Sequence, residues 1–368
     1  MTRRTRAIIH PEALRHNLAQ ARKAAPQSRV MAVIKADGYG HGLLRVAAAL
    51  RRADAFAVTC LEEAIPLREA GYAHPILLLA GPFEPSELEA CRRYRLDIVV
   101  HAPWQVELLE AASAGRALSV WLKIDSGMHR LGLMPEQVPE LHRRLTRCAA
   151  VNTHIRLITH MACADDRDDL RSTPGQVQRF AEAGAGLDGE RSLANSASVL
   201  GWPETHADWV RPGVMLYGVD PFCDEVAERP ALQPAMTLCS PLIAVRHLAA
   251  GERIGYGGTW ACPEDMPVGV VAIGYGDGYP RHAPSGTPLL VNGHRSRLLG
   301  RVSMDLICID LRGLEQQVQV GDDVVLWGRG LPVEQIAALS GTIGYELLCG
   351  VSPRVYREVE DGHGQGPE

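Results

Sequence analysis

Short apolar runs alternate with longer stretches of mixed polarity between residues 7 and 222. The runs are rich in Val, Ile, Leu and Ala, as parallel strands are when both of their faces are buried, and the stretches between them fit helices. Eight strand-then-helix units predict a closed (β/α)8 barrel, with a doubly wound open sheet as the structural alternative. The runs lie at residues 30–35, 55–59, 76–80, 97–101, 119–125, 155–161, 191–196 and 209–218.

Two of the expected helices carry start signals. Thr59 with Glu62, and Ser86 with Glu89, fit the capping box, in which a hydroxyl and a carboxylate three residues apart satisfy the free N–H groups of a helix N-terminus. Each pair stands at the end of an apolar run or a few residues after one, where a helix of the barrel is expected to begin.

The pattern changes near Pro230, because Pro230, Pro234 and Pro241 interrupt the chain. Beyond them, short β-branched runs are separated by glycine-rich turns, and helical periodicity is absent until residues 333–339. This pattern is typical of an all-β domain. We therefore expect a barrel domain, a mostly-β domain and a disordered tail without apolar periodicity. Their expected bounds are 1–229, 230–357 and 358–368.

Composition excludes several classes of protein. A hydrophobic fraction of 46% and a charged fraction of 22% are ordinary for a globular protein, and a net charge of −5 gives no basic surface for nucleic acid. No apolar run reaches the length of a membrane span, and the apolar stretch after Arg6 is too short for a signal peptide. The nine cysteines form no CxxC pair, which argues against a disulfide framework or a zinc site and favours the reducing cytoplasm.

Lys35 ends the first apolar run and opens into a segment that contains Gly38, Gly40 and Gly42. Active sites of βα-barrels lie at the carboxyl ends of the strands. A partly buried amine at that position has a lowered pKa and can act as a nucleophile toward an aldehyde. The alternative is an ordinary lysine whose stem lies along the strand end while its amine reaches water.

Functional side chains also end the later runs, and they predict a binding site along one rim of the barrel. Ser196 and Gly213 fit a phosphate site after the last two strands, although Ser196 also fits a helix N-cap. Arg211 fits a salt bridge across the barrel mouth, and His160 fits a core histidine. A nucleophilic lysine opposite a phosphate cradle favours pyridoxal 5'-phosphate (PLP) as cofactor. The rim residues are Lys123, Asp125, His160, Asn195, Ser196, Arg211 and Gly213.

The segment AVIKADGYGHG at residues 32–42 closely resembles the cofactor-lysine signature of the alanine racemase family, which are fold-type III PLP enzymes. The resemblance covers nearly the whole chain. Further matching segments lie in the barrel at 122–132, 159–160, 194–197 and 211–213, and in the second domain at 255–260, 274–278, 300–305 and 345–346. The resemblance implies a homodimer with shared sites that interconverts L-alanine and D-alanine and supplies D-alanine for peptidoglycan.

The resemblance also implies a role for each matching residue. Lys35 carries the cofactor and acts as one base, and Tyr256 of the other domain acts as the second. Arg130 and Met304 bind the substrate, and Lys123 matches a lysine that is often carbamylated. The implied cofactor-binding residues are Lys35, Tyr39, His160, Asn195, Ser196, Arg211, Gly213, Val214 and Tyr345, and the implied substrate entrance is Tyr275, Arg281 and Arg301.

One position departs from the family pattern. Ser192 stands where many members have a histidine that supports the arginine facing the pyridine nitrogen, so the orientation of Arg211 is an open question. Three rival functions also stay open: a basic-amino-acid decarboxylase, a non-catalytic PLP carrier, and a racemase for serine. The decarboxylase would place an acid where Arg211 lies, and the carrier leaves the β domain unexplained.

Overall fold

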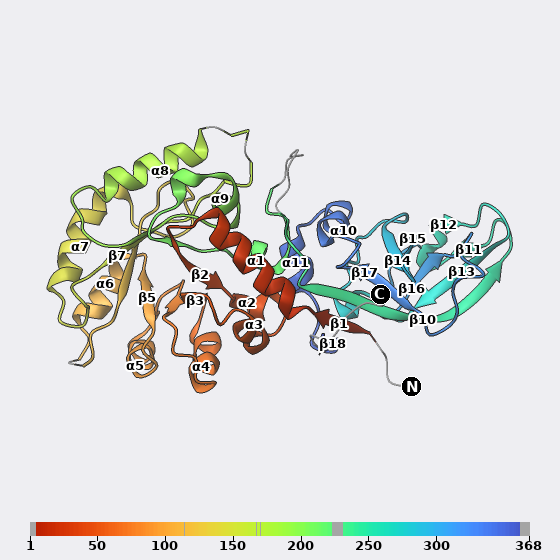
Figure 1. Ribbon diagram of the computed structural model, residues 1–368, viewed down its shortest axis with the longest axis horizontal. Helices are drawn as coiled ribbons and strands as arrows, with labels where there is room; N and C mark the ends of the chain where they lie inside the picture. Colours follow the sequence, from red (N-terminus) through yellow and green to blue (C-terminus); the bar gives the residue numbers. More distant parts are fainter. Residues whose placement is uncertain (1–4, 114, 167, 170, 223–230, 361–368) are drawn as a thin grey trace.

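The computed structural model describes residues 5–113, 115–166, 168–169, 171–222 and 231–360. It has two parts, a barrel domain and a β domain, which lie end to end (Figure 1). No helix in these ranges combines the length and the apolar character that a membrane crossing requires. In the same ranges, no group of three or more His, Cys, Asp or Glu side chains is arranged to hold a metal ion.

Within the described residues, eight parallel strands close into a barrel, which confirms the expected fold. The last strand pairs with the first, Arg29 opposite Trp209 and Val30 opposite Val210, so the open sheet is ruled out. The strands are β2 (Arg29–Val33), β3 (Ala55–Val58), β4 (Ile76–Leu78), β5 (Asp97–Val100), β6 (Val120–Lys123), β7 (Arg156–Ile158), β8 (Arg191–Ser192) and β9 (Trp209–Val210).

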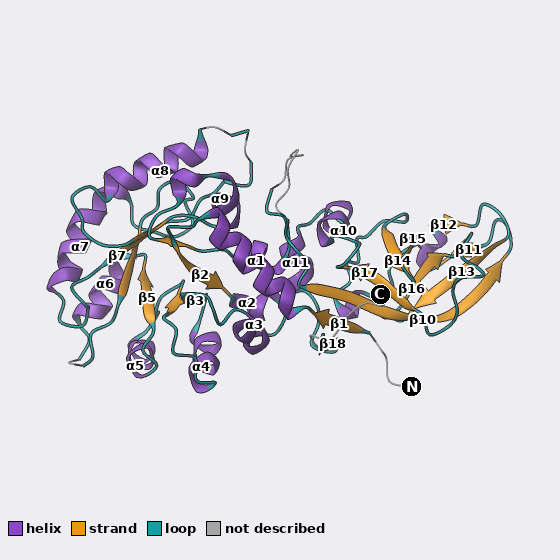
Figure 2. Cartoon of the chain, in the orientation of Figure 1, coloured by secondary structure: helices purple, strands orange, loops and turns teal. Residues whose placement is uncertain are grey.

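Helices surround the barrel strands, as the alternation of apolar runs and mixed stretches predicts (Figure 2). A short turn, α2 (Lys35–Tyr39), begins directly after the first barrel strand. The larger helices are α1 (Pro11–Ala24), α3 (Leu43–Ala49), α4 (Leu61–Glu69), α5 (Pro85–Arg93), α6 (Pro103–Glu110), α7 (Val138–Arg147), α8 (Ser172–Ala183) and α9 (Ser196–Gly201).

The predicted capping boxes are wrong by one or two residues. Helix α4 is preceded by Cys60 as its N-cap, and Glu63 rather than Glu62 reaches back to accept from the Thr59 N–H at 2.8 Å. Helix α5 starts after Glu84, and Glu87 accepts from the Phe83 N–H at 2.5 Å. Only a carboxylate at the third helical position can reach back to the free N–H groups of the helix start. Each helix begins one or two residues away from the start that the Thr or Ser indicated, so a different glutamate occupies that position.

The β domain is built around β10 (Met236–Leu248), a strand of 13 residues. In the described residues, an eight-stranded sheet has the order β13-β16-β15-β14-β17-β10-β1-β18, and β10 also pairs with β13. Two short helices complete the domain, α10 (Val333–Leu339), as the periodicity predicts, and α11 (Gly344–Cys349). The remaining strands are β11 (Arg253–Ile254), β12 (Trp260–Ala261), β13 (Met266–Val271), β14 (Pro288–Val291), β15 (His294–Leu299), β16 (Ile307–Asp310), β17 (Asp323–Trp327) and β18 (Tyr356–Val359).

The strand β1 (Arg6–Ile9) precedes the barrel in sequence but belongs to the sheet of the β domain. It runs antiparallel to β10 and parallel to β18, with Ile9 opposite both Met236 and Val359. Ala7 and Ile9 are fully buried there. The two ends of the chain therefore meet in one sheet, an arrangement that the sequence did not predict.

The prediction of a disordered tail from residue 358 onward is wrong for its first residues. Glu358 and Val359 complete β18, and the Glu360 carboxylate accepts from both Arg329 Nη1 and Nη2 and bonds with His10 Nδ1 at 2.9 Å. Pairing with β1 orders this segment because it satisfies backbone groups that apolar periodicity does not reveal. Residues 361–368 lie outside the described residues.

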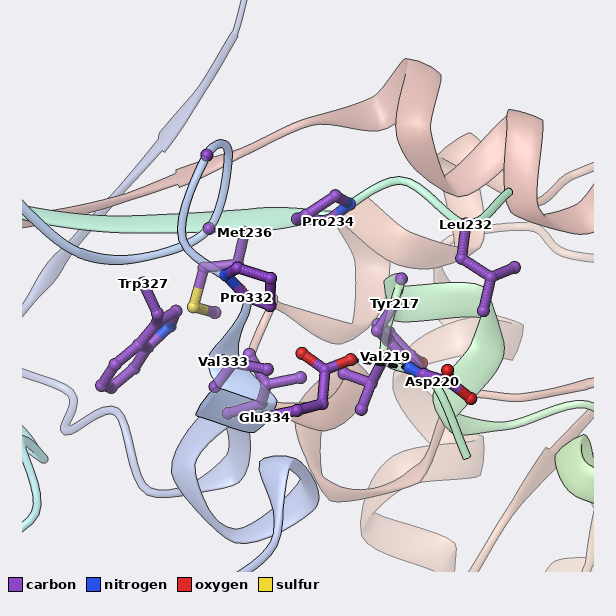
Figure 3. Close-up of a pocket in the computed structure, with 14 residues that line it drawn as sticks. Tyr217, Val219, Asp220, Leu232, Pro234, Met236, Trp327, Pro332, Val333 and Glu334 are labelled. Carbon is purple, nitrogen blue, oxygen red and sulfur yellow. Dashed lines mark hydrogen bonds between the residues drawn. The ribbon is translucent and has the colours of Figure 1, made fainter. Parts of the chain in front are cut away.

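A cavity of about 420 Å³ lies where the two domains meet (Figure 3). Tyr217 and Val219 line it from the barrel side, and Trp327 and Val333 line it from the β domain. The Asp220 N–H donates to Glu334 Oε1 at 2.7 Å across the junction. This hydrogen bond joins the last part of the barrel domain to α10 of the β domain. It helps to fix the two domains relative to each other.

Candidate active site

The Lys35 side chain stands at the carboxyl end of β2, at the start of an unusual turn. The next four residues, 36–39, all have left-handed backbone conformations, with φ between +51° and +62°. Each non-glycine residue in that conformation costs roughly 1–2 kcal/mol, because its Cβ approaches the following carbonyl oxygen. Strain of this kind is kept where the surroundings determine the conformation, which is typical of functional sites.

Several contacts hold the turn in place. The Ala36 N–H donates to Glu63 Oε1 at 2.5 Å, and the Leu43 N–H donates to Asp37 Oδ1 at 2.7 Å. Gly40 follows the turn with a φ of +79°, and a Cβ added there would lie 2.2 Å from the Leu348 carbonyl oxygen on α11. Only glycine permits this approach, which presses α2 against the β domain.

Tyr39 leaves the turn toward a cradle formed by the ends of β8 and β9. Its ring stacks on Tyr217 with a centroid separation of 4.5 Å, and Tyr345 of α11 lies 6.2 Å away. A Cβ added to Gly213 would lie 2.8 Å from the Tyr39 hydroxyl, so glycine leaves room for that hydroxyl. Ser196 Oγ accepts from the Gly213 N–H at 2.8 Å, at the start of α9.

Asn195 acts as the N-cap of α9. Its Oδ1 accepts from the Ser198 N–H at 3.1 Å, and its Nδ2 donates to the Met161 carbonyl oxygen at 3.1 Å. Val214 begins the 3₁₀ turn η3 (Val214–Tyr217) directly after Gly213. The capping assigned to Ser196 as an alternative therefore belongs to its neighbour Asn195, and the Ser196 hydroxyl faces the cradle backbone instead.

Arg211 is buried, and hydrogen bonds hold its guanidinium, one of them to Ser192. Its Nη1 donates to Ser192 Oγ at 2.6 Å, and its Nη2 donates to the Thr159 carbonyl oxygen at 2.6 Å. Ser192 Oγ in turn donates to the Trp209 carbonyl oxygen at 2.8 Å. Burial lowers the pKa of Arg211 to about 10, so the guanidinium stays charged near neutral pH.

Burial and nearby positive charges lower the pKa values of three other basic side chains of the site. Burial lowers the pKa of Lys35, and the charge of Arg130 lowers it further. Burial, followed by the charge of Arg211, lowers the pKa of Lys123 to about 8. The same two causes hold the pKa of His160 well below its usual value, so its imidazole is neutral.

We call the group that these residues form the barrel half-site, because contacts link its members: Ser196 with Gly213, Arg211 with His160, and Tyr39 with Tyr345. Arg130 belongs with them, because its charge acts on Lys35, Lys123 and His160. Asp125 instead accepts from the Gly127 and His129 N–H groups, at 2.9 and 3.1 Å, and so shapes the loop that carries Arg130. The barrel half-site comprises Lys35, Tyr39, Lys123, Arg130, His160, Ser196, Arg211, Gly213 and Tyr345.

A second group lies on the β domain, and we call it the β-domain half-site: Tyr256, Tyr275, Arg301 and Met304. Tyr275 donates its N–H to the Ser303 carbonyl oxygen at 3.1 Å, which brings its loop beside Met304. A Cβ added to Gly257 would lie 3.5 Å from Arg301 Nη1, so the Tyr256 turn adjoins Arg301. The Tyr256 side chain is 69% exposed and that of Met304 is 54% exposed.

The two half-sites are separate within one chain. Tyr256 lies in η4 (Tyr256–Gly258) between β11 and β12, and these strands lie at the end of the β domain away from the barrel (Figure 1). Arg281, which is exposed, follows the turn η5 (Tyr275–Asp277) on the β domain as well. The structure therefore gathers the predicted cofactor residues in one place and the predicted second base in another.

Comparison with known proteins identifies the family to which this arrangement belongs. The family model "Alanine racemase, N-terminal domain" matches residues 9–221, and "Alanine racemase, C-terminal domain" matches residues 235–359. The chain belongs to the alanine racemase family. It is 57% identical to the alanine racemase of Halorhodospira halophila over 98% of this chain and 99% of that protein, and 52% identical to that of Nitrosococcus oceani over 96% and 99%.

The fold agrees with solved alanine racemases. The crystal structure of the biosynthetic alanine racemase from Pseudomonas aeruginosa superposes with a TM-score of 0.93, at 47% identity, over 98% of this chain and all of that one. The alanine racemase from Acinetobacter baumannii gives a TM-score of 0.91 at 37% identity, over 97% and 100%. The chain is therefore a PLP-dependent alanine racemase, as its resemblance implies.

The barrel half-site of the racemase fits PLP by the chemistry of its donors. An aldehyde needs a primary amine with a lowered pKa, which Lys35 provides. A phosphate needs hydroxyl and backbone N–H donors without an intervening side chain, and Gly213 leaves that room beside the Tyr39 hydroxyl. Arg211 provides a buried cation for the ring side of the cofactor.

Sequence reasoning missed several residues that shape the racemase site. Tyr217 stacks under Tyr39, and Cys349 lies close enough for its thiol to influence the pKa of Lys35. Glu63 binds the backbone beside Lys35 from α4, but the capping pattern pointed to Glu62. Tyr217 and Cys349 had no signal in the sequence. Glu63 could have been found from its spacing, because it lies three positions after Cys60, the N-cap of α4.

Proposed function

We propose that the racemase moves the Cα proton of alanine with two bases, Lys35 on one face of the substrate and Tyr256 on the other. When bound, PLP draws electron density from Cα and so acidifies its proton. A single base would have to cross the plane of the substrate, whereas two bases need only accept and donate. Lys35 serves the D-enantiomer and Tyr256 the L-enantiomer. Burial lowers the pKa of the Lys35 amine, which supports its role as a base.

Arg211 favours racemisation over the rival decarboxylase reaction. A decarboxylase of the same two-domain plan requires an acid facing the pyridine nitrogen. Arg211 is a donor on all of its nitrogens, and its hydrogen bonds to Ser192 and Thr159 keep it directed and protonated. The hydrogen bond from Arg211 to Ser192 supports the proposal that this serine holds the arginine in place, as a histidine does in many other members of the family.

Substrate binding and passage are assigned to residues of both half-sites. Arg130 binds the alanine carboxylate and supports the Tyr256 phenolate, and Met304 contacts the substrate. Tyr275, Arg281 and Arg301 line the substrate entrance, which their exposure on the β domain supports. Alanine rather than serine is the favoured substrate, because the relatives with high identity are alanine racemases.

The separation of the two half-sites carries the proposal of a homodimer. Lys35 and Tyr256 cannot act on one Cα atom while they lie in different regions of the same chain. In a head-to-tail dimer, the β-domain half-site of one subunit completes the barrel half-site of the other. The exposed Tyr256 and Met304 support this arrangement, since each large apolar surface would be covered by a partner.

Lys123 is proposed as a site of carbamylation. The reaction requires a neutral amine, and a pKa lowered to about 8 leaves part of the amine neutral at physiological pH. The resulting carbamate anion would lie near the cations Arg130 and Arg211, whose charges lower the pKa of the uncarbamylated Lys123 amine.

The racemase supplies D-alanine for peptidoglycan in the cytoplasm, a role supported by its similarity to the enzyme named biosynthetic in Pseudomonas aeruginosa.

Mixing two inactive variants tests both the two bases and the dimer. Lys35→Ala and Tyr256→Phe proteins are each expected to be nearly inactive. After co-refolding in equal amounts, half of the dimers are mixed and each holds one intact site, so roughly a quarter of wild-type activity should return. Lys35→Ala mixed with the Lys35→Ala/Tyr256→Phe double variant is the control, and it should stay inactive. Absence of recovery in the first mixture would contradict shared sites.

A further inference from the structure

Glu63 joins two backbone segments at the barrel rim with its two carboxylate oxygens. Oε1 accepts from the N–H of Ala36, the residue that follows Lys35, at 2.5 Å. Oε2 accepts from the N–H of Thr59, at the end of β3, at 2.8 Å. Glu63 is half-buried on α4 and so reaches the turn from outside it. The carboxylate thus ties the lysine-bearing segment to the neighbouring strand.

The segment that Glu63 holds is the left-handed turn described above. Ala36 is its first residue and has a φ of +53°, and Tyr39 is its last with a φ of +51°. Lys35 precedes this turn and Tyr39 ends it, and in the proposed site the Lys35 amine would hold the aldehyde of PLP and the Tyr39 hydroxyl its phosphate. A turn with three strained non-glycine residues, Ala36, Asp37 and Tyr39, needs fixed partners, because the unconstrained chain prefers right-handed or extended conformations.

We propose that Glu63 is a positioning residue, which sets the distance between the Lys35 amine and the Tyr39 hydroxyl by holding the backbone at the start of the left-handed turn. The proposal rests on the proposed role of Lys35 as the cofactor lysine. Both oxygens of the carboxylate are used, so neither Gln, which has one acceptor oxygen, nor Ala can replace it fully. Charge-assisted hydrogen bonds of this kind are stronger than neutral ones.

Glu63 also balances the charges that face Lys35. The cation Arg130 lowers the pKa of Lys35, and the carboxylate of Glu63 raises it. Lys123 interacts with Lys35 as a second positive group, while His160 is neutral and the pKa of the Cys349 thiol is raised by burial, so neither carries charge near pH 7. Removal of Glu63 would leave the cations unopposed and lower the pKa of Lys35.

The experiment compares Glu63→Gln and Glu63→Ala with Glu62→Gln. Glu62 is the adjacent residue on α4 and is exposed, so its substitution changes the same charge without touching the turn. The apoenzyme is labelled with trace acetic anhydride between pH 6 and 11, and mass spectrometry of the Lys35 peptide gives the pKa of its amine. PLP affinity is measured by the absorbance change on titration, and kcat and KM are measured on the holoenzyme.

We expect the Lys35 labelling curve to move to lower pH in both Glu63 variants and to stay in place in Glu62→Gln. PLP affinity should fall, more in Glu63→Ala than in Glu63→Gln, and kcat should fall roughly 10- to 100-fold in Glu63→Ala with a smaller change in KM. Loss of thermal stability with an unchanged labelling curve and PLP affinity would overturn the proposal. If Lys35→Ala instead still bound PLP covalently, the proposed role of Lys35 would fail while the labelling result for Glu63 stood.

Discussion

His41 is fully buried beneath the Tyr39 turn, and its Nδ1 bonds with the carbonyl oxygens of Tyr39 at 2.8 Å and Gly38 at 3.1 Å. Burial lowers the pKa of His41 to about 4. An unfolded histidine titrates near 6.5, so the unfolded chain binds a proton more readily than the folded one as the pH falls. His41 therefore stabilises the fold fully above pH 6.5, and this contribution is lost progressively as the pH falls from 6.5 to 4.

The expected loss from His41 alone is about 2 kcal/mol of unfolding free energy between pH 7 and pH 5. Urea unfolding at both pH values measures it, in the wild type and in His41→Asn, whose amide can donate to the same carbonyl oxygens but does not titrate. The variant should lose about 2 kcal/mol less on acidification than the wild type, whatever its stability at pH 7. Equal losses in both proteins would show that His41 is not responsible.

Sequence motifs predict the chemistry of the site better than the contacts that position it. Lys35, Ser196, Arg211 and Gly213 stand at strand ends, and the fold brings strand ends to one rim by geometry alone. The support for Arg211 could not be predicted, because the bond to Ser192 Oγ depends on the approach of β8 and β9, which are two residues each. Contacts between elements distant in sequence leave no local pattern.

Among the elements, the turn α2 and the helix α11 depend on each other through Gly40. Gly40 has a φ of +79° and lies against the Leu348 carbonyl oxygen, whereas Gly71 has a φ of +84° with nothing within 4 Å of an added Cβ. Gly71→Ala should therefore cost only backbone strain, about 1–2 kcal/mol. Gly40→Ala adds overpacking and should cost about 2–5 kcal/mol.

Chemical denaturation measures both costs, and PLP titration distinguishes their consequences. Gly40→Ala should also weaken PLP binding, because displacement of α11 moves Tyr345 away from Tyr39, while Gly71→Ala should leave the affinity unchanged. Equal destabilisation by the two substitutions would mean that α2 and α11 adapt without cost, and the close approach at Gly40 would then have no part in the site.

The elements of the barrel were predictable because each is a local pattern, but the β domain was not predictable in full. Short runs were expected there, but β10 has 13 residues, which include Pro241 and a register shift between Leu242 and Ala244. Proline and irregular pairing interrupt the alternation that marks a strand. The strand β1 contributes four residues to a sheet whose other members follow the barrel, and such pairing is decided by tertiary contacts.

At the scale of the whole molecule, the turn that carries Met304 is the best place to test association. Ser303 donates its N–H to the Leu306 carbonyl oxygen at 3.0 Å, which closes a tight turn with Met304 and Leu306 exposed. Leu306 is 40% exposed, and Val320, in another turn of the β domain, is 59% exposed. Both side chains are apolar and exposed, but the proposed dimer covers the turn of Leu306 and leaves Val320 on the surface.

Leu306→Glu should weaken the dimer at least tenfold, because a carboxylate that loses water at an interface without a partner is costly. Sedimentation velocity over a dilution series measures the dissociation constant, and specific activity should fall in parallel on dilution, since each monomer holds only half of a site. Val320→Glu adds the same charge to a more exposed position and should leave both quantities unchanged. If Leu306→Glu remained as dimeric and as active as Val320→Glu at every concentration, the proposed interface would lie elsewhere on the molecule.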